Sequence, residues 1–342
     1  MDLNTFKARL KSGDVGGWYI FAGEEEYLKK YYLGELRDAI LDDPVFTPFN
    51  HVIFDGADVD IASLTEAVKS APMMSEYKLV EWRYGDLEHM RGSQLSAFED
   101  FLLMKKEYPY TVFAMLLTTE GFDPGTPKRP SKLMNKYSKT FDVLNFPKST
   151  DAQLLPWLKR HFDKEEISVS VSALNALIFR SGHGMDILKN EVEKLSAYLK
   201  ANGRQELTER DVNEVASSSV ECDAFALSNA ITAKNREAAF VALTDMKLRR
   251  IDPMAVLGML AKVYSELASV AILLDEGAGA ADIEAALSLN PYKVKLYVSA
   301  AKKYGAEHLS RTLCALCQKD AAAKYGGITG WCAIEMFIAE NI

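Results

Sequence analysis

The feature that most constrains the fold is the stretch of residues 18–30, WYIFAGEEEYLKK. Its first five residues are all apolar, which predicts a buried strand. Gly23 follows as a turn, and three glutamates then open a pattern with helical spacing. A buried strand, one glycine and a helix together predict the first strand-to-helix unit of an α/β domain.

This unit has the position of a phosphate-binding loop but lacks its chemistry. Such a loop has the pattern G-x-x-x-x-G-K-[ST], so that backbone N–H groups and a lysine surround the phosphates. Here Gly23 is followed by Glu24, Glu25 and Glu26. Carboxylates at a helix N-terminus satisfy the helix dipole and repel a polyphosphate. We therefore expect the scaffold of a nucleotide-binding domain without nucleotide binding.

Strands and helices alternate over residues 1–147, which predicts a parallel α/β sheet. After the first strand, further strands are expected at residues 49–54, 78–84, 111–118 and 140–146. Helices are expected at residues 1–12, 24–40, 60–70 and 93–106. The stretch 111–118 is almost entirely apolar, which is typical of a central parallel strand covered on both faces.

The pattern changes after Pro147, beyond which we expect helices and no strand. Residues 148–216 contain four helical patterns with short connections, which predict a small helical domain. Three consecutive serines, residues 217–219, are interpreted as a linker. Longer helical patterns then predict a C-terminal all-α domain over residues 217–342.

The net charge of −8 argues against nucleic-acid binding through overall charge. Residues 128–164 are an exception, because they contain nine lysines and arginines against three aspartates. Such a cluster is either a solvated surface or part of a positive chamber that follows a DNA backbone. The sequence alone leaves both interpretations open.

The remaining features indicate a protein of the reducing cytoplasm. No signal peptide and no membrane-spanning segment is expected. Four cysteines are present, and Cys314 and Cys317 form a C-x-x-C inside a helical pattern. Without further cysteine or histidine ligands nearby, we interpret this pair as small helix-core residues. The five histidines are dispersed, so neither a metal site nor a catalytic site is expected.

Four stretches, taken in order, resemble one known family. They are the glutamate-rich turn after the first strand, APMMSEYKLV at residues 71–80, GMDILKNEVEKLSAY at 184–198, and DAFALSNAI at 223–231. Together they resemble the delta subunit of the bacterial DNA polymerase III clamp loader. The resemblance implies a degenerate AAA+ (P-loop-NTPase-like) sheet domain, a helical lid domain at 148–216 and a helical collar at 217–342 that serves oligomerisation.

The catalytic parts of an ATPase are missing from the sequence. No apolar stretch ends in a paired Asp-Glu, and the best strand runs into Thr119 and Glu120. A lone glutamate cannot both bind Mg²⁺ and polarise the attacking water. Arg180 lies in the predicted lid, but it lacks the surroundings of an arginine finger. We expect neither ATP hydrolysis nor a cofactor.

Met73 and Met74 are adjacent, so they cannot both point into one core from a regular element. Spacing alone leaves open that one of them fills the core. The resemblance implies instead that this pair, with Pro72, is a hydrophobic tip that inserts into a pocket of a ring-shaped sliding clamp and opens it. Many family members have Leu-Phe or Phe-Phe at this position, whereas methionine suits an adaptable pocket.

Candidates for DNA contact are Tyr325, Lys128, Arg129 and Lys132. Tyr325 follows one long helical pattern and precedes another. An aromatic side chain at such a turn can stack on an unpaired base, or it can be a core or cap aromatic. The closing segment resembles the family pattern K-x-x-Y-G-x…W-A-x-E, with one extra residue before Trp331. This resemblance implies that Tyr325 contacts the template at the primer junction.

We therefore interpret the chain as a clamp-loader subunit of the bacterial replisome that opens the beta sliding clamp for loading onto primed DNA. Polymerase activity would belong to the whole DNA polymerase III holoenzyme. The implied partners are the clamp, the loader ATPase subunits (tau/gamma), delta-prime and primed-template DNA. The alternatives are an AAA+ ATPase with an unorthodox nucleotide site and a helical adaptor protein.

Overall fold

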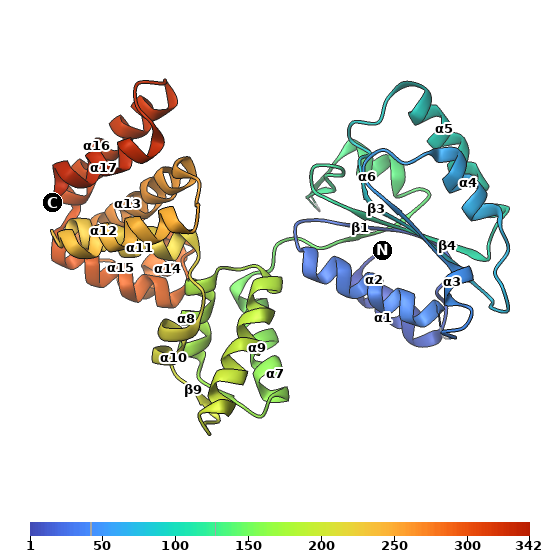
Figure 1. The fold of residues 1–342 in the computed structure, drawn as a ribbon, viewed down its shortest axis with the longest axis horizontal. Helices are drawn as coiled ribbons and strands as arrows, with labels where there is room; N and C mark the ends of the chain where they lie inside the picture. Colours follow the sequence, from blue (N-terminus) through green and yellow to red (C-terminus); the bar gives the residue numbers. More distant parts are fainter. Residues whose placement is uncertain (42, 127) are drawn as a thin grey trace. The chain divides into compact units, whose positions relative to one another are not determined.

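The computed structural model describes residues 1–41, 43–126 and 128–342. It contains two compact units, Met1–Ser149 and Thr150–Ile342 (Figure 1). The first has a parallel sheet with helices, and the second is almost entirely helical. The predicted fold class, α/β followed by all-α, is confirmed. The division of the second part into a lid and a collar stays a prediction, because both lie within one compact unit.

Five parallel strands form the sheet of the first unit, in the spatial order β2-β3-β4-β1-β7. The strands are β1 (Trp18–Ala22), β2 (His51–Asp55), β3 (Lys78–Gly85), β4 (Thr111–Leu117) and β7 (Asp142–Asn145). Every residue of β1 and β4 is buried. These two strands lie next to each other inside the sheet, and β2 and β7 form its edges.

Helices cover both faces of this sheet, as fully buried parallel strands require. On one face lie α1 (Leu3–Ser12) and α2 (Glu26–Ile40). On the other lie α4 (Ile61–Lys69), α5 (Gly92–Leu102) and α6 (Lys132–Tyr137) (Figure 1). Successive residues of β1 serve the two cores in turn: Tyr19 packs with α1 and α2, and Trp18 packs with α5. The result is a three-layer α/β unit.

Short elements of the first unit differ from the prediction. Residues 49 and 50 end a short helix, α3 (Thr47–Asn50), instead of opening a strand, and the 3-10 helix η1 (Leu103–Lys106) follows α5. A hairpin of β5 (Gly125–Thr126) and β6 (Arg129–Pro130), followed by α6, was not expected. Elements of two to six residues are too short to give a clear periodic signal.

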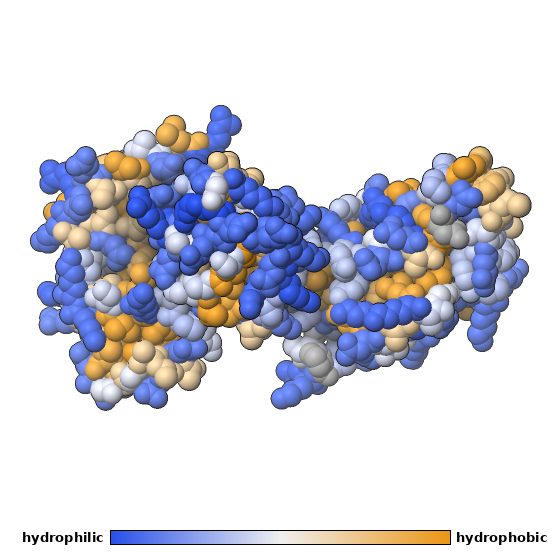
Figure 2. All heavy atoms as spheres, turned by 90° about the horizontal axis from the view of Figure 1, so that it is seen from below, coloured by the Kyte–Doolittle hydropathy of each residue, from blue (hydrophilic) through white to orange (hydrophobic). Residues whose placement is uncertain are grey.

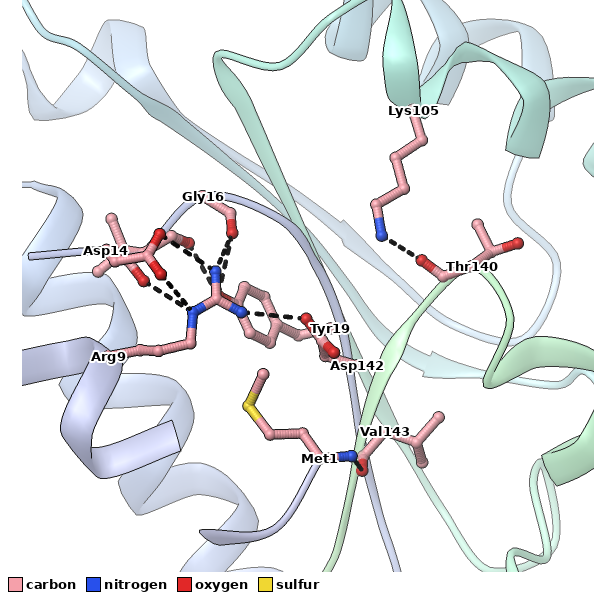
Figure 3. Close-up of polar contacts among 10 residues, drawn as sticks. Met1, Arg9, Asp14, Gly16, Tyr19, Lys105, Thr140, Asp142 and Val143 are labelled. Carbon is pink, nitrogen blue, oxygen red and sulfur yellow. Dashed lines mark hydrogen bonds and ion pairs between the residues drawn. The ribbon is translucent and has the colours of Figure 1, made fainter. Parts of the chain in front are cut away.

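Arg9 of α1 joins the amino ends of two strands (Figure 3). Its guanidinium donates to the carbonyl oxygen of Gly16 at 2.5 Å and to the carboxylates of Asp14 at 3.0 Å and Asp142 at 3.1 Å. Gly16 lies just before β1, and Asp142 begins β7. The guanidinium also lies over the ring of Tyr19. Burial raises the pKa of Tyr19 to about 12, so its hydroxyl group stays neutral.

The second unit begins with four helices: α7 (Asp151–Lys164), α8 (Val171–Ser181), α9 (Met185–Ala201) and α10 (Glu209–Val215). A two-residue parallel pair, β8 (Ser168–Val169) and β9 (Glu206–Leu207), lies among them. The expectation of no strand beyond Pro147 was therefore wrong. Such a pair is too short to show an alternation of apolar and polar residues, so no periodic pattern predicts it.

Seven longer helices follow: α11 (Val220–Thr232), α12 (Arg236–Leu248), α13 (Pro253–Asp275), α14 (Ala280–Leu287), α15 (Pro291–Tyr304), α16 (Ala306–Lys324) and α17 (Gly330–Asn341). Their shared core surrounds α13, which contacts α11, α15 and α16. Among the described residues, α13 alone is long and apolar enough to cross a membrane by length and composition. Half of its most apolar stretch is buried, as in the central helix of a bundle.

The serines interpreted as a linker are hydrogen-bonded to the preceding helices. The carbonyl group of Ser217 accepts from the hydroxyl group of Ser181 of α8 at 2.9 Å. The N–H of Ser217 donates to the carboxylate of Glu191 of α9 at 3.2 Å. The N–H of Ser219 donates to the carbonyl group of Arg180 at 2.6 Å. These contacts fix the connection into α11.

A buried carboxylate joins three elements of the first unit. Glu81 of β3 is fully buried and accepts from Arg37 of α2 at 2.9 Å and from Arg83 at 2.7 Å. The Nε2 atom of His51, at the start of β2, lies 2.8 Å from the same carboxylate. Burial alone raises the pKa of Glu81, but the hydrogen bonds from His51, Arg37 and Arg83 lower it to about 2. Glu81 is therefore ionised and ties α2 to β2 and β3.

We expect Glu81→Gln to lower the free energy of unfolding at neutral pH by about 3 kcal/mol, since a pKa lowered from 4.5 to about 2 has that effect. The folded-state pKa lies below the unfolded-state value. The stabilisation is thus present above about pH 4.5 and is lost as the pH falls toward 2. Urea unfolding of both proteins measures it. A difference that is the same at about pH 7 and about pH 3 would contradict this assignment.

Candidate functional site

The predicted tip lies in the connection from α4 to β3, at the amino end of β3. Pro72 is half-buried, whereas Met73 is 45% and Met74 82% exposed. Neither methionine belongs to the core. Met74 has a φ of 53°, in the left-handed region that residues with a Cβ atom rarely adopt. The chain therefore holds an apolar side chain toward solvent in an unfavourable backbone conformation.

The base of the tip is held by side chains of the neighbouring strands. The last C=O groups of a helix lack partners within the helix. In α4, the carbonyl oxygens of residues 67, 68 and 69 accept from Lys78 at 2.5 Å, Thr111 at 2.8 Å and Tyr110 at 2.8 Å. Lys78 is buried, and burial lowers the pKa of its ammonium group. The tip thus begins from a fully hydrogen-bonded helix end.

Asn50, the last residue of α3, contacts the tip directly. Its Nδ2 donates to the carbonyl oxygen of Met73 at 2.8 Å, and its Oδ1 accepts from the N–H of Met73 at 2.7 Å. Sequence reasoning missed Asn50, because residue 50 was assigned to a strand. The signal that could have found it is an asparagine just before an apolar strand, where a buried amide must find partners.

Other apolar side chains near the start of β2 are also exposed. Val45 and Phe49 lie in the segment before β2, and Ile53 lies within this edge strand. On the face drawn in Figure 2, apolar residues gather in separate groups between hydrophilic ones. Phe49 precedes Asn50 directly, so an exposed aromatic ring lies next to the residue that contacts the tip.

At the carboxyl end of β1, the chain itself fills the position expected for phosphates. Gly23 has a φ of 105°, and a Cβ atom there would lie 2.3 Å from the carbonyl oxygen of Phe146. The N–H of Glu25 donates to that same oxygen at 3.0 Å. A backbone N–H group that a phosphate-binding loop would offer to its ligand is thus used within the protein.

Lys29 of α2 closes this position further. Its ammonium group is fully buried, donates to the carbonyl oxygen of Leu117 at the end of β4 at 2.7 Å, and pairs with Glu26 at 2.5 Å. The prediction of a helix that begins with three glutamates needs correction, because α2 starts at Glu26 and Glu24 is exposed before it. The helix-dipole argument therefore applies to Glu26, within the first turn.

Glu120 and Arg180 are the two residues whose side chains ATPase chemistry could use. Glu120, three residues beyond the end of β4, is exposed. Arg180 of α8 donates its Nε to the carbonyl oxygen of Ala216 at 2.7 Å, within its own unit. Neither residue contacts a second catalytic group among the described contacts.

The candidates for DNA contact are exposed. Lys128 and Arg129 belong to the β5–β6 hairpin, and Lys132 begins α6. They therefore lie close together in the first unit. Tyr325 is the C-cap residue directly after α16, is 90% exposed, and is followed by Gly326 with a φ of 79°. A core position is therefore wrong for Tyr325, whereas the cap position of the same alternative agrees with the structure.

The C-x-x-C pair was predicted correctly as helical but wrongly as core. Cys314 and Cys317 lie in α16, and both are exposed. The apolar core side of α16 is formed instead by residues such as Leu309 and Leu316. Among the described residues, no group of three or more histidine, cysteine, aspartate or glutamate side chains could hold a metal ion.

Comparison with known proteins identifies the family. Residues 19–102 match the family model for the DNA polymerase III delta subunit, and residues 221–341 match the model for the C-terminal domain of that subunit. The two matches together cover more than half of the chain.

A curated relative and a solved structure agree with these matches. The chain is 23% identical to DNA polymerase III subunit delta of Bacillus subtilis (strain 168), over 97% of this chain and 94% of the relative. The solved DNA clamp loader delta protein of Bacillus subtilis has a TM-score of 0.51 at 21% identity, covering 98% of both chains. The fold is therefore shared along the whole chain, and this protein belongs to the family of DNA polymerase III delta subunits.

Proposed function

We propose that this delta subunit binds the beta sliding clamp through Met73 and Met74, with Pro72 at the start of the tip, and opens the clamp for loading onto primed DNA. The observation that carries the proposal is the exposed methionine pair on a hydrogen-bonded base at the amino end of β3. Large apolar side chains that fill a partner's pocket are typical anchors of protein–protein interfaces.

Clamp opening by such a tip is differential binding. A ligand shifts a conformational equilibrium only by the difference between its affinities for the two states. The tip opens the ring if it fits the pocket of the open clamp better than that of the closed clamp. The hydrogen-bonded backbone at the base of the tip supports this mechanism. Because the base is fixed, the fit between the tip and the clamp pocket also determines how the rest of the subunit is placed on the clamp.

The helical second unit is proposed to serve assembly. Residues 148–216 would form the lid, and residues 217–342 the collar that joins the loader ATPase subunits (tau/gamma) and delta-prime. The exposed apolar residues Phe240, Val241 and Leu248 of α12 support a role in subunit contacts. In this assembly the chain acts in the cytoplasm as part of the DNA polymerase III holoenzyme.

We expect the double substitution Met73→Ala and Met74→Ala to weaken binding to the sliding clamp by about 100-fold or more. Burying a methionine contributes about 1.5–3 kcal/mol. Because both side chains are exposed, the thermal melt should stay nearly unchanged. Surface plasmon resonance with immobilised clamp measures the affinity. Met336→Ala, at an exposed methionine of α17, is the matched control. Unchanged clamp binding by the double variant would refute the proposal.

We also propose that the chain does not bind or hydrolyse ATP, which the contacts of Gly23, Glu25 and Lys29 support. Isothermal titration calorimetry of the isolated chain with MgATP is expected to give no heat of binding. A dissociation constant in the micromolar range would instead support the alternative of an ATPase with an unorthodox site.

Contact with primed-template DNA is proposed for Tyr325, Lys128, Arg129 and Lys132. Each lysine or arginine that contacts a phosphate releases counterions and so steepens the dependence of DNA affinity on salt concentration. Replacing all three with glutamine should reduce the slope of log affinity against log salt concentration by the amount expected for up to about three phosphate contacts. Tyr325→Ala should lower affinity by about 1–3 kcal/mol without changing that dependence.

Fluorescence anisotropy of the assembled loader at several salt concentrations separates the two effects. Lys30→Gln, at an exposed lysine of α2, serves as the control. If the triple variant has the same salt dependence as the unchanged loader, these three side chains do not contact phosphates.

A further inference from the structure

We propose that Asn50 is a positioning residue for the clamp-binding tip, and that its side-chain amide fixes the backbone of Met73 so that Met74 is presented to the clamp. The inference rests on the proposed function of Met73 and Met74. It assigns to a buried residue outside the tip a specific part in partner binding.

The geometry suits asparagine and few other side chains. The two hydrogen bonds, 2.8 Å and 2.7 Å long, use both polar groups of the Met73 backbone. The amide orientation is determined by these partners, because a carbonyl oxygen only accepts and an N–H only donates. Aspartate would lose the donor, glutamine is one methylene longer, and alanine would lose both bonds. Asn50 is 2% exposed, so water does not replace these bonds.

The tip needs such a hold because its own side chains do not supply one. A left-handed conformation at a residue other than glycine is unfavourable and persists only where its surroundings impose it. Met74 has this conformation, and its side chain is almost fully in solvent. Burial of Met74 therefore does not stabilise the turn, whereas the bonds from Asn50 fix the residue directly before it.

Asn50 is in turn fixed to the sheet. Its own N–H donates to the carbonyl oxygen of Phe46 at 3.1 Å within α3. The next residue, His51, begins β2, pairs in register with Leu79 of β3 and contacts the buried Glu81. Asn50 is thus covalently bonded to the first residue of β2 and hydrogen-bonded to the tip. The position of Met74 is therefore fixed relative to the sheet.

The test compares clamp binding by the full chain with Asn50→Ala, Asn50→Asp, Met74→Ala and the double variant Asn50→Ala/Met74→Ala. Asn50→Ala should bind the clamp at least about tenfold more weakly although both methionines are present, mainly through faster dissociation. Asn50→Asp keeps the acceptor but turns an oxygen in place of the donor toward the carbonyl oxygen of Met73, so it should also weaken binding. In the Met74→Ala background, Asn50→Ala should have a smaller effect than in the unchanged chain, because only Met73 is left to be positioned.

Asn175→Ala is the matched control, since Asn175 is also buried and hydrogen-bonded but lies in the second unit. Asn175→Ala should leave clamp binding unchanged, although it should lower the melting temperature about as much as Asn50→Ala does. If Asn50→Ala does not fold, Asn50→Asp carries the comparison with the control.

The outcomes separate this inference from the proposed function. If Asn50→Ala binds normally while the Met73/Met74 double variant does not, Asn50 has no positioning role and the tip remains the binding element. If the effects of Asn50→Ala and Met74→Ala simply add, Asn50 acts on overall stability and the inference is wrong. If the Met73/Met74 double variant still binds, the proposed function fails, and the inference fails with it.

Discussion

Two strands buried on both faces limit where the sheet of this protein can bind a partner. Helices must cover both faces of β1 and β4, so within the sheet only the strand ends remain for function. The carboxyl end is the usual ligand site of an open α/β sheet. Here the carbonyl group of Phe146 accepts from the N–H of Glu25, and the buried ammonium group of Lys29 donates to Leu117, so these polar groups are used within the protein. The amino end carries the hydrogen-bonded base and the exposed methionines, and there we place the working surface.

The tip combines a hydrogen-bonded backbone with exposed, unbranched side chains. Lys78 holds the carbonyl oxygen of Ala67 at the end of α4, and Asn50 holds the backbone of Met73, so little backbone ordering remains for the moment of binding. Methionine is unbranched and polarizable, so its side chain adapts to the shape of a pocket. A stiff support and an adaptable surface are different requirements, and different residues meet them.

The parts of the fold that could be predicted are those with long, regular patterns. The apolar stretch ending in Leu117 and the long C-terminal helices follow from periodicity and length. The contacts of Asn50 with Met73 and of Glu81 with Arg37 could not be predicted, because they join residues more than 20 positions apart and depend on how strands pair. For Cys314 and Cys317, the spacing placed both on one helix face but did not show which face is covered.

The separation of tip and core has a consequence for how such a subunit changes over generations. Neither Met73 nor Met74 contributes to the buried core, so under the proposed function a side-chain substitution there would change partner affinity with little penalty in folding. Selection could then adjust that affinity in small steps, in parallel with changes in the partner. Asn50 and Lys78 lack this freedom, because their buried polar groups would lose their hydrogen bonds on substitution.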